Sequence, residues 1–121
     1  MTAHRSVLRL SGRVLADPLW IASTHAERMQ GLLRRSGLPP GEALLIERCR
    51  SIHTVGMQFA IDVVFLDREG RVVKLAPAVR AWRMALGGRK ARCVVEAAAG
   101  WLDRTGVAVG DRLDWATPEL A

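Results

Sequence analysis

The pattern of apolar and polar positions predicts a chain built mainly of short β-strands. Short apolar or alternating runs, bounded by glycine, proline or charged turn residues, occupy 6–10, 19–23, 43–47, 60–67, 71–76, 93–97 and 112–116. Residues 60–67 are apolar on both faces of the predicted strand, so we expect an inner strand of a sheet. The charged and glycine residues at 68–70 then predict a hairpin between this strand and 71–76.

Two segments follow a helical pattern instead. Thr24 and Glu27 have the capping-box spacing, in which the hydroxyl and the carboxylate each accept a hydrogen bond from a main-chain amide of the first turn. Apolar residues recur at helical spacing over 26–33, and Gly37, followed by two prolines, predicts the end of this helix. Residues 98–106 predict a second, shorter helix that a terminal glycine closes.

Together these elements predict an α+β domain with a mostly antiparallel, partly barrel-like β-sheet and two short helices. We expect one domain over residues 1–121, with its core within 6–116 and a frayed tail at 117–121. A doubly wound nucleotide-binding fold is not expected, because no glycine-rich turn joins a strand to a helix. Residues 76–92 lose periodicity and contain a proline and a glycine pair, so they predict a long surface loop.

Charge and cysteine content narrow the class of protein. Eighteen basic residues, nearly all arginine, against twelve acidic residues give a formal net charge of +6, which a solvated basic surface explains. No apolar run approaches the roughly 20 residues of a membrane span, and the N-terminal segment lacks the apolar stretch of a signal peptide. We therefore expect a cytoplasmic protein in which Cys49 and Cys93 are free, buried thiols.

Four blocks of sequence, in a fixed order, carry a family resemblance. They are THAERMQGLLRRSGL (24–38), SIHTVGMQFAIDVVFLDREGRVV (51–73), VVEAAAG (94–100) and RTGVAVGDRL (104–113). Together they resemble the domain of unknown function 192 (DUF192), also called uncharacterised protein family 0127, over nearly the whole chain. The resemblance implies a small, mostly β fold and no established activity, cofactor or catalytic residue. It singles out the polar residues Glu27, Arg28 and Glu96, whereas SIHTVGM departs from the aromatic-Trp-Met run of many members.

The polar run before the 60–67 strand is the first candidate site. In one interpretation His53, Thr54, Met57 and Asp62 bind a small ligand, with the imidazole and the carboxylate supplying hydrogen bonds. In another, His53 is the general base of a hydrolase or small-group transferase, with a nearby hydroxyl or thiol as nucleophile. In the third, these polar side chains only bind main-chain groups where the strand begins. The sequence leaves all three open and assigns no catalytic residue.

The predicted loop 76–92 is the second candidate site. Arg80, Trp82, Arg83 and Arg89 combine guanidinium groups with an aromatic ring, which suits an anion, an acidic protein or RNA. Nucleic acid is the less favoured partner, because the chain carries neither a helix-turn-helix nor an RNA-recognition motif. The tryptophan has an alternative role as an anchor that holds the loop on the core.

Metal chemistry has little support in the sequence. Cys49 and His53 are four residues apart, and neither belongs to the short-spaced ligand pairs that are typical of zinc sites. We therefore expect no metal and no cofactor. The predicted function is a non-enzymatic module that binds a small molecule or an acidic protein.

Overall fold

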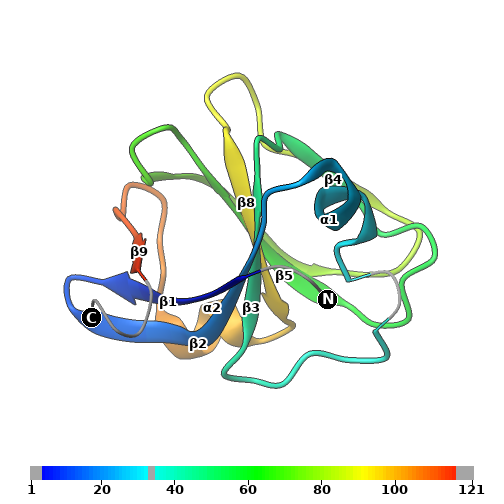
Figure 1. Ribbon diagram of the computed structural model, residues 1–121, viewed down its shortest axis with the longest axis horizontal. Helices are drawn as coiled ribbons and strands as arrows, with labels where there is room; N and C mark the ends of the chain where they lie inside the picture. The colour runs from blue at the N-terminus through cyan, green and yellow to red at the C-terminus, as the bar shows by residue number, and fades with distance from the viewer. Residues whose placement is uncertain (1–3, 33–34, 117–121) are drawn as a thin grey trace.

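The computed structural model describes residues 4–32 and 35–116. Its strands are β1 (His4–Leu10), β2 (Arg13–Ala22), β3 (Ala43–Glu47), β4 (Ser51–His53), β5 (Ile61–Leu66), β6 (Val72–Val79), β7 (Met84–Leu86), β8 (Cys93–Ala98) and β9 (Asp114–Ala116), and its helices are α1 (His25–Gln30) and α2 (Trp101–Thr105). Among these residues a seven-stranded sheet has the order β6-β5-β8-β3-β2-β1-β9, and β4 pairs with β7 in a separate ribbon. Figure 1 shows α1 beside β4 at the upper right of the view and α2 at the bottom, below β2 and β3.

The large sheet is mostly antiparallel, as predicted, but it is mixed because one pair of strands is parallel. β2 and β3 run parallel because the chain crosses between them through α1, whereas the other neighbouring strands are antiparallel. The partly barrel-like part of the prediction is wrong, since the sheet is not closed. In the described part of the chain, ladder pairing between its two ends is limited to an isolated bridge that joins Arg71 to Arg112.

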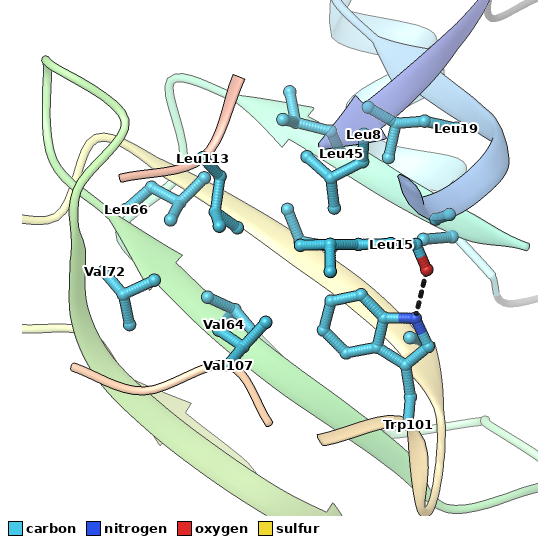
Figure 2. Packing of buried hydrophobic residues seen from close by; sticks show 14 of the residues in the cluster. Leu8, Leu15, Leu19, Leu45, Val64, Leu66, Val72, Trp101, Val107 and Leu113 are labelled. Atoms are coloured by element: carbon cyan, nitrogen blue, oxygen red, sulfur yellow. Dashed lines mark hydrogen bonds between the residues drawn. The ribbon is translucent and has the colours of Figure 1, made fainter. Parts of the chain in front are cut away.

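Each face of the sheet carries its own apolar cluster, because successive strand residues point to opposite faces. The α2-side cluster consists of Leu8, Leu15, Ala16, Leu19, Ile21, Ala43, Leu45, Val64, Leu66, Val72, Cys93, Val95, Ala97, Trp101, Leu102, Val107 and Leu113. The ribbon-side cluster consists of Ala22, Leu32, Leu38, Leu44, Ile46, Ile52, Met57, Ile61, Val63, Phe65, Ala85, Ala91 and Val94. In the α2-side cluster the buried Trp101 donates a hydrogen bond from its indole Nε1 to the Leu15 carbonyl at 3.0 Å (Figure 2).

Several elements predicted from local sequence signals are present in the structure. The capping box of α1 is formed, with the Glu27 amide donating to the Thr24 hydroxyl and the Thr24 amide donating to the Glu27 carboxylate. The hairpin of β5 and β6 and the helix α2, closed by Gly106 at φ 72°, are also confirmed. The end of α1 was predicted too late: the helix stops at Gln30, and Gly31 with φ 48° is its C-cap.

Three other boundaries were predicted wrongly. β2 begins at Arg13 rather than at residue 19, because its first half pairs with β1 across a tight turn at residues 11–12. Residues 76–92 are not one loop, since β6 continues to Val79 and β7 forms within the segment. The last strand is shorter than predicted and begins at Asp114, and the predicted frayed tail lies outside the described residues.

Candidate functional site

The ribbon of β4 and β7 is amphipathic across its two faces. Its register pairs Ser51 with Leu86, Ile52 with Ala85, and His53 with Met84. The central pair is buried in the ribbon-side cluster, whereas both residues of each flanking pair are exposed. The period of two along each strand therefore produces one inward face that covers the core and one outward face that meets solvent.

Thr54 fixes the turn that leads into β7. Its buried hydroxyl donates to the Arg80 carbonyl at 2.6 Å and accepts from the Arg83 amide at 2.7 Å. Its own carbonyl accepts from the Trp82 amide at 3.0 Å. All of the hydrogen bonds of the hydroxyl run to main-chain groups of residues 80–83, so this predicted ligand-binding residue has a structural role. The predicted ligand contact Met57 is likewise buried, within the ribbon-side cluster.

The outward surface beside this turn is unusually apolar for exposed residues. Trp82, Met84 and Leu86 are 66%, 69% and 56% exposed, so the tryptophan does not anchor the segment to the core. The backbone of Trp82 adopts φ 63°, in the left-handed region that bulky residues rarely occupy. The turn therefore holds the indole outward at a conformational cost.

The ribbon and its flanks carry only positive charge. The segments 48–61 and 70–95 contain no aspartate and, before Glu96, no glutamate, but they hold two and seven of the eighteen basic residues respectively. Two of these basic side chains reach the ribbon segments directly: Lys74 Nζ donates to the Leu86 carbonyl at 2.6 Å, and Arg50 donates to the Arg89 carbonyl at 3.1 Å. Arg80, Arg83 and Arg89 are exposed around them. The exposed apolar side chains thus lie on a segment whose charged residues are all cations.

His53 and Asp62 do not meet. The Asp62 carboxylate is buried on the α2 side, where it accepts from the main-chain amides of Ala78 (2.8 Å), Gly100 (3.1 Å) and Leu102 (2.8 Å). His53 is exposed on the ribbon, which covers the other face of the sheet. The ligand-binding or acid–base pair that the sequence suggested is therefore not assembled.

The nucleophile that the hydrolase interpretation needs is also missing from the described residues. No hydroxyl or thiol there forms a hydrogen bond with the His53 ring, and the Thr54 hydroxyl is held by residues 80–83. The Cys49 thiol donates to the Ser51 carbonyl at 3.0 Å, and burial raises its pKa, which keeps it protonated. This geometry gives no support to covalent catalysis at His53.

The three polar residues that the family resemblance singled out have different environments. Glu27 belongs to the capping box, and Arg28 donates to the Arg48 carbonyl at 2.7 Å while its Nε is buried without a partner. Glu96 is only 5% exposed and lies between Leu44 of β3 and Val63 of β5. Burial raises the pKa of its carboxyl to about 7. A glutamate inside the apolar run CVVEA was the signal that the sequence offered for this burial.

Within residues 4–32 and 35–116, no three histidine, cysteine, aspartate or glutamate side chains come together as ligands of a metal ion would. Neither helix in this part of the chain has the length and apolar character that a membrane crossing requires.

Comparisons with known proteins identify the family. The family model DUF192, described as "Uncharacterized ACR", matches residues 7–115. The chain belongs to the DUF192 family. A UPF0127 protein of Pyrococcus abyssi is 33% identical over 103 residues, covering 80% of this chain and 85% of that protein. One of Thermococcus gammatolerans is 34% identical over 114 residues, covering 89% of this chain and 72% of that protein.

A match to the UPF0127 protein of Pyrococcus furiosus is closer but shorter. It is 40% identical over 65 residues, which are 54% of this chain and only 55% of that protein. Activities and partners of the whole relative are therefore not transferred to this DUF192 chain.

Two crystal structures share the DUF192 fold described above. A Sinorhizobium meliloti protein, provisionally described as a transcription regulator, has a TM-score of 0.85 at 22% identity, covering 95% of this chain and 96% of its own. A Novosphingobium aromaticivorans protein of unknown function has a TM-score of 0.80 at 19% identity, covering 93% of this chain and 85% of its own. At these identities the likeness concerns the fold alone.

Proposed function

We propose that this DUF192 protein is a non-enzymatic, protein-binding module whose β4–β7 ribbon docks an acidic segment of a partner protein. The observation that carries the proposal is the outward surface of β7 and of the turn before it, where Trp82, Met84 and Leu86 are each more than half exposed. Tryptophan and methionine are enriched in protein interfaces, and tryptophan is among the most frequent hot-spot residues. Exposed apolar side chains gathered on one element are typical of an interaction site.

The positive charge around the ribbon favours one class of partner. The ribbon segments and their flanks are free of carboxylates over 48–61 and 70–95, and Arg80, Arg83 and Arg89 are exposed near the apolar side chains. Such a surface repels basic partners and speeds the approach of acidic ones. The preferred partner is therefore an acidic segment that also supplies apolar side chains to cover the indole and the methionine.

The direct test is fluorescence anisotropy with a short labelled peptide of alternating glutamate and leucine. We expect saturable binding that weakens steeply as salt rises, because the exposed cations are screened. Trp82→Ala removes a central apolar contact and is expected to weaken binding at least tenfold. The double variant Arg80→Glu, Arg83→Glu is expected to abolish it.

Matched controls separate a specific site from general attraction. Val109→Ser removes another exposed apolar side chain, 62% exposed and outside the ribbon, and Arg68→Glu reverses an exposed charge in the β5–β6 turn. Neither variant should change the affinity by more than about twofold. A lysine–leucine peptide of the same length should not bind.

Two outcomes would overturn the proposal. One is equal affinity of the acidic peptide for the wild type and for Trp82→Ala. The other is preferential binding of a labelled single-stranded RNA that ignores the acidic peptide, which would favour nucleic acid as the partner of residues 76–92.

A further inference from the structure

Asp62 and Glu96 are both buried in the large sheet, but only one of them has partners. Asp62 accepts three main-chain hydrogen bonds, as described above. Among the residues that the structure describes, Glu96 forms neither a hydrogen bond nor an ion pair. Buried polar groups without a partner are rare because each loses its hydration without compensation, so Glu96 requires an explanation.

The apolar surroundings of Glu96 make the lack of a hydrogen-bond partner energetically costly. Its neighbours in the register are Leu44 on β3 and Val63 on β5, so an apolar side chain flanks it on either side. It shares its face with Val94 of the same strand, and this face is packed by the ribbon-side cluster. The carboxyl group is therefore a polar group among apolar neighbours on this face of the sheet.

A second unpartnered polar atom belongs to the same region. Arg28 Nε is the one buried side-chain nitrogen or oxygen atom without a partner that the described residues contain. The charges of Glu96 and Arg28 act in opposite directions on the pKa of the Cys49 thiol, which places both groups within electrostatic reach of this half-buried side chain. Arg28 and Glu96 do not form an ion pair with each other.

The carboxyl group is also reachable. Glu96 is 5% exposed, so a small part of this side chain touches solvent. A small molecule that reaches it would meet a carboxyl acceptor set in apolar side chains. Pockets with this make-up, mostly apolar with a few placed polar groups, are typical of small-molecule sites.

We propose that Glu96 anchors a second binding site, which takes a small primary amine carrying an apolar body. The ammonium group supplies the hydrogen bonds and the opposite charge that the carboxylate lacks, and the apolar body lies against the ribbon-side cluster. The site lies on the inner side of the ribbon, so it goes beyond the proposed docking of a partner on the outer side. Failure of the peptide test would leave it untouched.

The probe is 3-methylbutylamine, compared with 3-methyl-1-butanol, which has the same apolar body without the charge. Isothermal titration calorimetry of the intact protein is expected to detect the amine and to find the alcohol at least tenfold weaker. The amine stays protonated between about pH 5.5 and pH 8.5, whereas Glu96, with its pKa of about 7, ionises within this range. If only the carboxylate binds the amine, the affinity for the amine increases about thirtyfold from pH 5.5 to pH 8.5.

Other titrating or charged groups near Glu96 are accounted for in the same experiment. Those in its neighbourhood are the Arg28 guanidinium and the Cys49 thiol, and burial raises the pKa of this thiol further from neutrality. Neighbouring strands place Leu44 and Val63 beside it, and neither of them titrates. A pH dependence centred near 7 therefore reports on Glu96.

Two variants and one spectroscopic measurement decide the outcome. Glu96→Gln keeps the shape of the side chain and should lose at least tenfold in amine affinity, whereas Glu69→Gln, the same substitution at an exposed position, should lose nothing. On the unmodified protein, saturating amine should lower the pKa of the Glu96 carboxyl measured by carbon-13 NMR. Amine binding that survives Glu96→Gln, no binding at millimolar amine, or an unchanged Glu96 titration would each overturn the proposal.

Discussion

The buried carboxyl of Glu96 predicts a specific dependence of stability on pH. Its pKa is about 7 in the folded protein and takes the usual value of 4.5 when the chain unfolds. Below pH 4.5 the group is protonated in both states, so its ionisation does not affect the free energy of unfolding. As the pH rises from 4.5 to 7, the unfolded chain releases this proton while the folded chain retains it. Stability therefore falls across this window and levels off above it.

The size of the loss follows from the two pKa values. Each pH unit between 4.5 and about 7 corresponds to about 1.4 kcal/mol, so burial of the ionised carboxyl costs about 3 kcal/mol at pH 8. Glu96→Gln cannot ionise and avoids this cost. We expect the variant to match the wild type near pH 4.5 and to be more stable by as much as 3 kcal/mol, to order of magnitude, at pH 8.

Urea unfolding followed by far-ultraviolet circular dichroism, at pH 4.5, 6 and 8, measures this difference. The other carboxylates contribute equally to both proteins, so they cancel when the two curves are subtracted. Glu69→Gln is the control, since it removes an exposed carboxylate and should leave the pH dependence of the wild type unchanged. A Glu96→Gln curve parallel to that of the wild type would refute the reasoning, because it would mean that the carboxyl is ionised and compensated at neutral pH.

Four further predictions test the structural roles of other residues. Thr54→Val should lower the free energy of unfolding by roughly 2 kcal/mol in urea titrations, since it removes the partner of a part-buried amide and of a part-buried carbonyl. Asp62→Ala should cost about 3 kcal/mol or more by the same assay, because three amides lose a charged acceptor. In the folded protein a thiol reagent at pH 8 should modify the half-buried Cys49 slowly and the buried Cys93 more slowly still, since burial raises the pKa of both thiols and that of Cys93 to about 12. Gly87→Ala should lower the thermal midpoint by several degrees, because the added methyl group would overlap the Phe65 ring.

Short-range signals in the sequence were good predictors of local structure. The Thr24–Glu27 capping box, the β5–β6 hairpin and the glycine that closes α2 each depend on residues within a few positions of one another. The prediction of the α1 end failed because two glycines were available, and the helix stops at Gly31 rather than near Gly37. Propensity alone does not choose between two such stop signals.

The β4–β7 ribbon was missed because its strands are three residues long. A run of three residues is too short to show the alternation that predicts a strand, and each strand exists only because the other pairs with it. Residues 76–92 therefore had the sequence pattern of a loop. Nevertheless, the predicted partner surface lies in the segment that contains the exposed Trp82 indole. Its predicted residues are Arg80, Trp82, Arg83 and Arg89.

The candidate pair of His53 and Asp62 shows a different limit. Nine positions separate the two residues, and no pattern in the sequence states which face of the sheet each element occupies. The structure places the carboxylate under α2 and the imidazole on the ribbon, on opposite sides of one sheet. Proximity in the sequence was therefore a poor guide to proximity in space.

By itself the sequence determined the membership of the DUF192 family, a mostly β fold with two short helices, and the strands, helix starts and turns whose signals lie within a few residues. Only the tertiary structure decided that β2 and β3 are parallel, that β4 and β7 pair, and that Glu96 is buried without a partner in the described part of the chain while Asp62 has three. The physical reason is the range of the interactions. Capping and turn formation depend on neighbours along the chain, whereas strand pairing, burial and the pKa of a buried carboxyl depend on groups that only the complete fold brings together.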